Sequence, residues 1–319
     1  MKIRVKEKEE TSKAKVKETN LWKDALHRLM RNRMATIGGV IVIALCITAI
    51  FAPLVAPYAY DEGNFWNNYA KPGKEYWLGA DFMGRDLLSR IIYGTRVSLS
   101  VGLMGATVSF VIGIIYGLIA GYAGGKVDNY MMRLVDIGYG VPTLLFIILL
   151  MVYFKSSFAS IQPGTLGGML SSIDNALGGM FFIFIGIGIT SWLGMARLAR
   201  GMTLSLKEKE FIETARAMGA SNLRIISRHI LPNIIGPCII SQTLTIPTYI
   251  LYEAFLSFIG LGVNPPTPSW GMMISEGYQG MRSYPHLVLF PALALSITMF
   301  AFNFLGDGLR DALDPHMKL

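Results

Sequence analysis

The sequence predicts an all-α integral membrane protein with six transmembrane helices. Of its 319 residues, 52% are hydrophobic and only 16% are charged, whereas soluble domains carry about 25% charged residues. Six apolar runs reach the roughly 20 residues that a helix needs to cross the hydrocarbon core, and helices satisfy their own backbone hydrogen bonds in lipid. The runs cover residues 37–57, 96–120, 134–154, 181–199, 234–261 and 286–305.

Positive charge is distributed unevenly between the two sides of the predicted membrane. With the N-terminus inside, four inner segments hold 22 of the 29 Lys and Arg residues. These segments are residues 1–36, 122–133, 194–233 and 306–319. The distribution follows the positive-inside rule, and an even number of spans returns the C-terminus to the same side. Topology therefore explains the net charge of +8, and no nucleic-acid interface is expected.

The first part of the chain, residues 1–36, is expected to be a cytoplasmic tail followed by an interfacial helix. Residues 1–20 are rich in Lys and Glu without apolar periodicity, which is typical of a solvated tail. Residues 22–34 place apolar side chains on one helical face and basic side chains on the rest, as in helices that lie on anionic lipid. A simple basic flank of the first span is the alternative.

Residues 37–93 are predicted to comprise the first transmembrane helix and an external segment. Arg85 and Arg90 lie on the side where positive charge is less expected. Pairing with Asp81 and Asp86 would lock this segment into a folded external cap. Contact with an external partner or with a substrate is the alternative.

Residues 94–319 are predicted to form a five-helix core. The second span carries small residues at every fourth position, which lets another backbone approach closely in lipid. This ladder consists of Gly105, Ser109, Gly113, Gly117 and Gly121. In the third span, Asp136 is expected to form a structural ion pair with Arg133.

Catalytic and nucleotide-binding motifs are missing from the sequence. The nearest match to a P-loop has Ala120 in place of its first glycine and Val127 in place of its hydroxyl residue. The four histidines are scattered without metal-ligand spacing. We therefore expect neither an enzyme nor a bound cofactor or metal.

The fifth span carries polar residues that are costly in a bilayer. Glu253 is ionisable, and such residues within spans are normally functional or paired. Gln242, Thr245 and Tyr249 precede it on the same helix. These four residues are candidates for the wall of an aqueous pathway. Alternatively, they form hydrogen bonds between helices, or Glu253 serves as the proton site of a secondary transporter.

The inner segment 202–233, hereafter the docking loop, predicts two short helices. Residues 207–218 place Phe211, Ile212, Ala215 and Met218 on one stripe. Gly219 follows at a position typical of a left-handed helix cap. Ser221 can cap a second helix, which we expect to end at Pro232. A rigid protrusion is predicted.

This loop resembles the "EAA" loop of permease subunits of bacterial ABC importers. Glu213, Ala215, Gly219, Leu231 and Pro232 match the family pattern, whereas Thr214 replaces an alanine and His229 an isoleucine. Segments 78–102, 253–274 and 306–315 resemble the C-type subunit of the dipeptide, oligopeptide and nickel branch. The resemblance covers nearly the whole chain beyond residue 22.

The resemblance implies a type I-like importer permease fold with cytoplasmic coupling helices, in a bacterial inner membrane with both termini cytoplasmic. It implies a second permease subunit, two ATPase subunits that bind ATP and magnesium, and an external substrate-binding protein. The loop residues implied to dock on the ATPase are Glu213, Ala215, Arg216, Gly219, Ala220, Leu231 and Pro232. A membrane protein that docks a partner without transport remains an alternative.

Overall fold

The computed structural model describes residues 21–158 and 165–313, and its regular elements within these ranges are helices. The predicted tail, residues 1–20, lies outside the described residues. The elements are α2 (Leu21–Arg31), α3 (Arg33–Ile50), α4 (Ala52–Val55), η2 (Phe65–Asn67), α5 (Leu87–Ala123), α6 (Gly125–Tyr139), α7 (Thr143–Phe158), α8 (Leu166–Ala176), α9 (Met180–Lys207), α10 (Glu210–Ala217), α11 (Asn222–Ile225), η3 (Ile226–Ile230), α12 (Leu231–Phe258), α13 (Trp270–Tyr278) and α14 (His286–Leu313).

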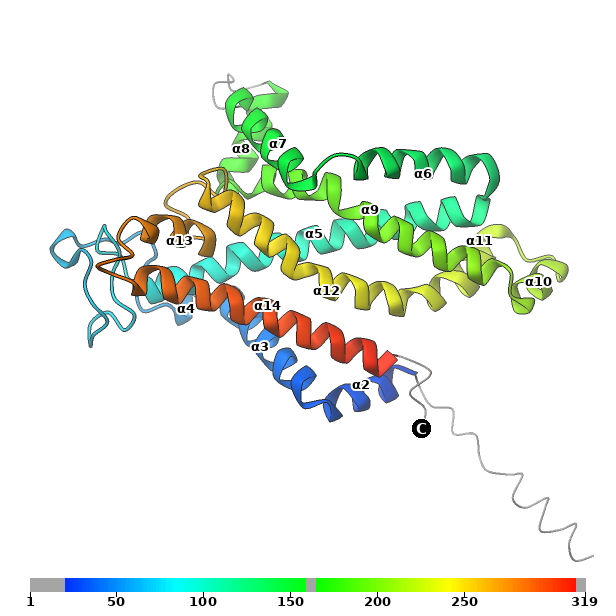
Figure 1. The fold of residues 1–319 in the computed structure, drawn as a ribbon, viewed down its shortest axis with the longest axis horizontal. Helices are drawn as coiled ribbons and strands as arrows, with labels where there is room; N and C mark the ends of the chain where they lie inside the picture. The colour runs from blue at the N-terminus through cyan, green and yellow to red at the C-terminus, as the bar shows by residue number, and fades with distance from the viewer. Residues whose placement is uncertain (1–20, 159–164, 314–319) are drawn as a thin grey trace, which may run out of the picture.

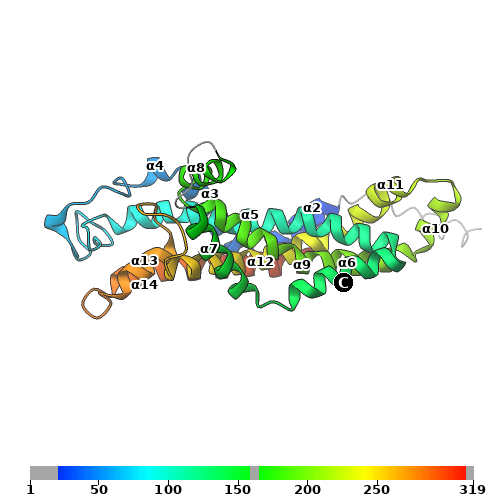
Figure 2. The same ribbon diagram turned by 90° about the horizontal axis from the view of Figure 1, so that it is seen from above.

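The helices form an elongated bundle with two different ends (Figures 1 and 2). Helices α5, α9 and α12 run along its length, with α3 and α14 on one side. One end carries α10 and α11, and we call it the loop end. The opposite end carries α13 and residues 58–86, and we call it the cap end. The two predicted functional segments are therefore separated by the full length of the bundle.

The structure contains five helices that are long and apolar enough to cross a membrane, among the residues it describes. They are α3, α5, α9, the continuous helix Asn222–Phe258 and α14. A sixth span is present if α6 and α7 are taken together, although they are bent by 80°. The six predicted spans are all represented in this way.

The prediction of one continuous helix over residues 134–154 is wrong. Helix α6 ends at Tyr139, and α7 begins at Thr143. Pro142 lies in the break, and its ring disfavours helical backbone at Val141, the residue before it. Hydropathy alone does not detect such a break because the interrupting residues are themselves apolar or small.

The interfacial helix and the first span are separate elements. Helix α2 ends at Arg31, and the Asn32 side chain caps α3 by accepting hydrogen bonds from the amides of Met34 (3.1 Å) and Ala35 (3.3 Å). This cap allows the chain to change direction at a single residue. The helix predicted before the first span is thus present as a separate element, while its contact with lipid stays a prediction.

The small-residue ladder of α5 packs closely against α9, as predicted. A Cβ atom added at Gly113 would lie 2.5 Å from the Cβ of Met195, and one at Gly117 would lie 2.5 Å from the Ala196 carbonyl oxygen. The Ser109 hydroxyl donates to the Ser191 carbonyl at 2.8 Å. The two backbones therefore approach as closely as their atoms permit.

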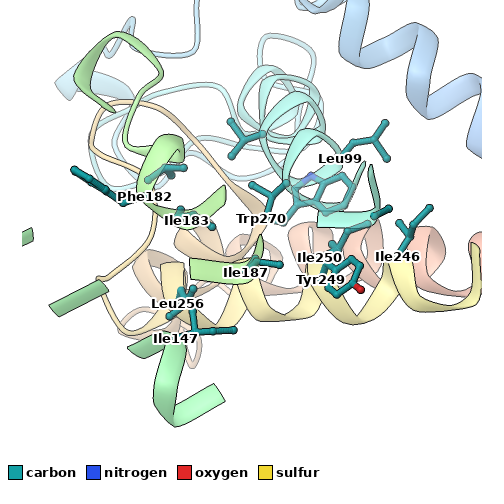
Figure 3. Close-up of a cluster of buried hydrophobic side chains, with 14 of the residues drawn as sticks. Leu99, Ile147, Phe182, Ile183, Ile187, Ile246, Tyr249, Ile250, Leu256 and Trp270 are labelled. Atoms are coloured by element: carbon teal, nitrogen blue, oxygen red, sulfur yellow. The ribbon is translucent and has the colours of Figure 1, made fainter. Parts of the chain in front are cut away.

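A buried apolar cluster joins the central helices near the cap end (Figure 3). Ile246, Tyr249 and Ile250 of α12 belong to this cluster together with Ile187 of α9. Trp270, at the start of α13, is fully buried and donates its indole N–H to the Ile91 carbonyl of α5 at 3.2 Å. The cluster fixes α13 and the cap end on the transmembrane core.

Two interhelical ion pairs hold α6 against α9. Arg200 contacts both carboxylate oxygens of Asp128, at 2.5 and 2.6 Å. Arg197 binds Asp136 at 2.5 Å and lies over the Tyr139 ring, 3.9 Å from its centroid. The prediction that Asp136 pairs with Arg133 is therefore wrong. Arg197 binds Asp136 instead, because the Arg197 guanidinium can bind the carboxylate and stack on the Tyr139 ring at the same time.

We expect Gly117→Ala to lower the free energy of unfolding of the purified protein by about 1–3 kcal/mol, because the new methyl group meets backbone atoms of α9. Gly201→Ala is the matched control, since nothing lies within 4 Å of its Cβ position on the same pair of helices. This control should be neutral or stabilising because alanine favours helices. Thermal unfolding in detergent measures both. Equal midpoints for the two variants would contradict close packing at Gly117.

Candidate functional site

The docking loop projects beyond the long helices at the loop end (Figure 1). Helix α9 ends at Lys207, α10 follows from Glu210 to Ala217, and α11 begins at Asn222. The turn between α10 and α11 is closed by glycine. Gly219 has φ +80°, and the amides of Gly219 and Ala220 donate to the carbonyls of Arg216 and Ala215, both at 3.0 Å. This pair of bonds is a Schellman motif, which favours glycine at its left-handed position.

Buried side chains anchor the docking loop on the long helices. Ile212, Ile225 and Ile230 are fully buried. They belong to an apolar cluster with Ile114 and Leu118 of α5 and Met195 and Ala199 of α9. The loop is therefore part of the packed core and not a loose connection.

Two hydrogen bonds add to this anchoring. The Tyr122 hydroxyl of α5 donates to the Asn222 side-chain oxygen at 2.8 Å. The Lys207 ammonium donates to the Tyr122 carbonyl at 2.7 Å. Both bonds connect the end of α5 with the docking loop, one at the end of α9 and one at the start of α11, so that movement of the loop is coupled to α5.

The outer face of the docking loop exposes large apolar side chains. Met218 is 78% exposed, Leu223 is 77% exposed and Phe211 is 44% exposed. The predicted stripe is thus divided, because Ile212 and Ala215 face the core while Phe211 and Met218 do not. Exposed apolar residues among charged ones are typical of a protein-docking surface.

The other predicted docking residues differ in their exposure. Glu213, Arg216, Gly219 and Pro232 are exposed, Ala220 and Leu231 are partly buried, and Ala215 is 3% exposed. Only part of the sequence motif can therefore contact a partner directly. Ala215 instead supports the loop from beneath, where a larger side chain would disturb its packing against the core.

The prediction that a second short helix ends at Pro232 is wrong. The chain is helical from Asn222 to Phe258 without interruption. Pro232 lies in the first turn of α12, directly after the π-helical turn Ile226–Ile230. A proline needs no amide donor there, and the wider π turn rearranges the backbone hydrogen bonds before it. The docking loop therefore continues directly into a membrane span.

Glu253 lies inside the protein between two of the long helices. Its side chain is fully buried. The Ser98 hydroxyl of α5 donates to one carboxylate oxygen at 2.8 Å, and the Ser257 hydroxyl donates to the other at 2.7 Å. This geometry favours a hydrogen-bonding role within the chain over a position on an open pathway surface.

The other pathway candidates are also largely inside the chain. Gln242 and Tyr249 are 7% and 4% exposed, and the Tyr249 hydroxyl donates to the Ser191 carbonyl at 3.3 Å. Thr245 is partly buried and donates to the Ser241 carbonyl at 2.7 Å. Their role in a pathway stays a prediction, and Thr245 has the most accessible surface of the four.

A buried cluster of charges fixes the cap end. Arg85 binds Asp81 at 2.7 Å, and Arg90, which is fully buried, binds Asp81 and also Glu276 at 2.7 Å. Asp86 does not pair with an arginine. It caps α5 by accepting from the Ser89 amide at 2.7 Å. The predicted pairing is thus present for Asp81 and wrong for Asp86.

Glu276 was not predicted as a partner of these arginines. It is the only acidic residue between Glu253 and Asp307. The available signal is a single acidic residue within a long stretch of sequence that contains no other acid. The distance of nearly 190 residues between the partners hides the contact from local sequence reasoning.

In the part of the chain that the structure describes, no group of three or more His, Cys, Asp or Glu side chains could hold a metal ion.

The long helices and the exposed, firmly anchored docking loop define a membrane permease subunit. Residues 113–319 match the family described as "Binding-protein-dependent transport system inner membrane component". The chain belongs to this family. Residues 20–72 also match the "N-terminal TM domain of oligopeptide transport permease C".

Curated relatives are similar over nearly the whole chain. The oligopeptide transport system permease protein OppC of Bacillus subtilis is 40% identical, with 97% of this chain and 94% of the relative covered. OppC of Escherichia coli K12 is 42% identical over 96% of this chain and 94% of the relative. The dipeptide permease DppC of B. subtilis is 39% identical over 92% and 86%.

A solved structure shares the fold at low sequence identity. It is the inward-facing MetNI methionine ABC transporter, with a TM-score of 0.55 and 19% identity. The match covers 72% of this chain and 98% of the other. The all-helical permease fold expected from the resemblance is confirmed.

We expect Glu253→Leu to lower the free energy of unfolding by about 2–4 kcal/mol, because two buried serine hydroxyls lose their acceptor. Glu253→Gln should cost less, since its amide oxygen still accepts. Thr248→Val, at an exposed position on the same helix, is the control. Unfolding midpoints in detergent measure the series. A destabilisation by Leu no larger than that of the control would contradict this role.

Proposed function

We propose that the chain is the membrane permease subunit of an ATP-driven importer of short peptides. The names of its relatives support peptides as the substrate class, because oligopeptide and dipeptide permeases match 92–97% of this chain. We also propose a complex of this chain with a second, similar permease subunit, two ATPase subunits and an external substrate-binding protein. Magnesium and ATP would be bound by the ATPase subunits.

The proposed orientation places the docking loop and both termini in the cytoplasm of a bacterium, with the cap end outside. The positive-inside distribution supports this arrangement, since segments on the proposed inner side hold 22 of the 29 Lys and Arg residues. An external cap end would then receive the substrate-binding protein, and the docking loop would receive an ATPase. The lipid-facing surfaces of the spans remain in contact with the membrane.

The combination of an exposed and a buried face on the docking loop carries the proposal. Met218 and Leu223 offer apolar surface to a partner, whereas Ile212 and Ile225 are buried against the long helices. An ATPase that binds the exposed face would therefore move α5, α9 and α12 with the loop. ATP can drive such a movement only through a difference in affinity between the inward-open and outward-open states.

The alternative of a proton-coupled secondary transporter has no support. Glu253 is enclosed by the chain and hydrogen-bonded to two serines. The family is described as a component of binding-protein-dependent transport, and the curated relative of B. subtilis is named an oligopeptide transport permease. We therefore do not assign a transported proton to Glu253.

We expect the double variant Met218→Glu, Leu223→Glu to reduce co-purification of the ATPase subunits at least about tenfold, because charges replace the apolar docking surface. Met218→Leu and Leu223→Met are the matched controls, since they conserve volume and apolar character. Quantitative pull-down from membranes measures the effect. Unchanged ATPase recovery with the double variant would contradict the docking assignment.

Substrate class is tested with the complete complex in proteoliposomes. We expect labelled trialanine to accumulate when ATP and magnesium are on the ATPase side and the substrate-binding protein is outside. Nickel ions, the other substrate class implied by the family resemblance, should not accumulate. Nickel uptake without trialanine uptake would overturn the peptide assignment.

A further inference from the structure

A polar pocket near the cap end is lined by two opposite charges, Lys155 and Asp174, which form no direct ion pair with each other among the described residues. It has a volume of about 270 Å³ and lies between the end of α7, helix α8 and the segment after α12. Its polar lining includes Lys155, Ser171, Asp174, Asn175 and Asn264. These residues belong neither to the docking loop nor to the charge cluster of the cap.

The lysine is fixed at the edge of the pocket by the backbone. Its ammonium donates to the Gly262 carbonyl at 2.6 Å. An ammonium has three donor hydrogens, so that this bond satisfies only one of them. Lys155 is thus held in position and retains donors for a ligand.

The acidic residue is fixed on the other side. Asp174 is 6% exposed and accepts a hydrogen bond from the Phe182 amide at 3.2 Å. Burial raises the pKa of this carboxyl above its ordinary value, because the carboxylate has lost its water. The Lys155 charge and the backbone hydrogen bond offset part of this cost, and an ammonium group of a ligand beside Asp174 would offset more of it.

The segment after α12 is tied to α8, which keeps the two charges in one pocket. The Asn264 amide N–H donates to the Gly178 carbonyl at 2.8 Å, and its side chain donates to Asn175 at 3.4 Å. Although both charges line the pocket, Lys155 and Asp174 form no ion pair with each other among the described contacts. The space between them is available to a ligand.

The charge pattern selects the chemistry of that ligand. A free cation is repelled by Lys155, and a free anion is repelled by Asp174. A molecule that carries both an ammonium and a carboxylate satisfies both side chains at once, and a short unblocked peptide is such a molecule. The volume lies just below the roughly 300 Å³ at which pockets for drug-sized ligands begin, so it suits a short peptide or the end of a longer one.

We infer that this pocket is an external binding subsite for short zwitterionic peptides, in which Lys155 binds the terminal carboxylate and Asp174 binds the terminal ammonium. The inference rests on the proposed function, because peptide import supplies the ligand, and on the proposed orientation, which places the cap end outside. Asn175 is exposed and lines the pocket, so a ligand can reach the pocket from solvent.

Equilibrium dialysis with the assembled complex of permease and ATPase subunits, without the substrate-binding protein, tests the subsite. The probes are labelled trialanine, its C-terminal amide and its N-acetyl form. The parent should bind trialanine about tenfold more tightly than either blocked form, as expected for the loss of one charge-assisted contact. Lys155→Met should weaken trialanine binding about tenfold, and this variant should bind trialanine and its C-terminal amide equally well. Asp174→Asn should also weaken trialanine binding about tenfold, and this variant should bind trialanine and its N-acetyl form equally well.

Control variants separate binding from folding. Lys155→Arg keeps the charge and should retain preference for the free carboxylate, whereas Lys74→Met removes an exposed cap-end lysine and should change nothing. Unfolding midpoints show which variants are folded. If Lys155→Met does not fold, the test relies on Asp174→Asn. The subsite would be overturned if folded Lys155→Met and Asp174→Asn bound trialanine as tightly as the parent does. It would also be overturned if the parent bound the blocked forms as tightly as trialanine. Trialanine uptake by the complete complex would still uphold the proposed function in that case.

Discussion

The close contact between α5 and α9 is the constraint on which the rest of the structure depends. Lipid tails are as apolar as the helix surfaces, so burial of apolar area gives little reason for two helices to associate. Small residues at four-residue intervals allow the backbones to touch, and dispersion contacts then replace the missing driving force. Arg90 of the buried charge cluster lies on α5 to one side of this contact, and the docking loop is anchored on the other side.

Much of this arrangement could be predicted because it depends on local chemistry. The six spans follow from composition, and the Gly219 cap follows from the need for a left-handed residue after α10. The ladder of α5 could be read from spacing alone. In each case one short stretch of sequence contains all the information, and no distant partner has to be known.

The errors have the opposite cause. Glu276 binds Arg90, which is almost 190 residues away in the sequence. Asp136 binds Arg197 of α9 and not Arg133, which is closer in sequence and lies on the same helix as Asp136. Whether Met218 points outward or inward depends on where α5 and α9 lie, which periodicity cannot give. The helix continues through Pro232 because the wider π turn before it rearranges the backbone hydrogen bonds that a proline would otherwise interrupt. Sequence shows which residues are present there, but not the π turn that precedes it.

The uninterrupted helix from Asn222 to Phe258 acts as a lever. Its 37 residues measure roughly 55 Å along the helix, at about 1.5 Å per residue. The helix is curved (Figure 1), and it contains the π turn Ile226–Ile230 and two internal prolines, Pro237 and Pro247. If it tilts as one body by about 10° around its centre, each end moves by up to roughly 5 Å, and the two ends move in opposite directions. A small displacement of the loop end would then reach the far end reversed in sense.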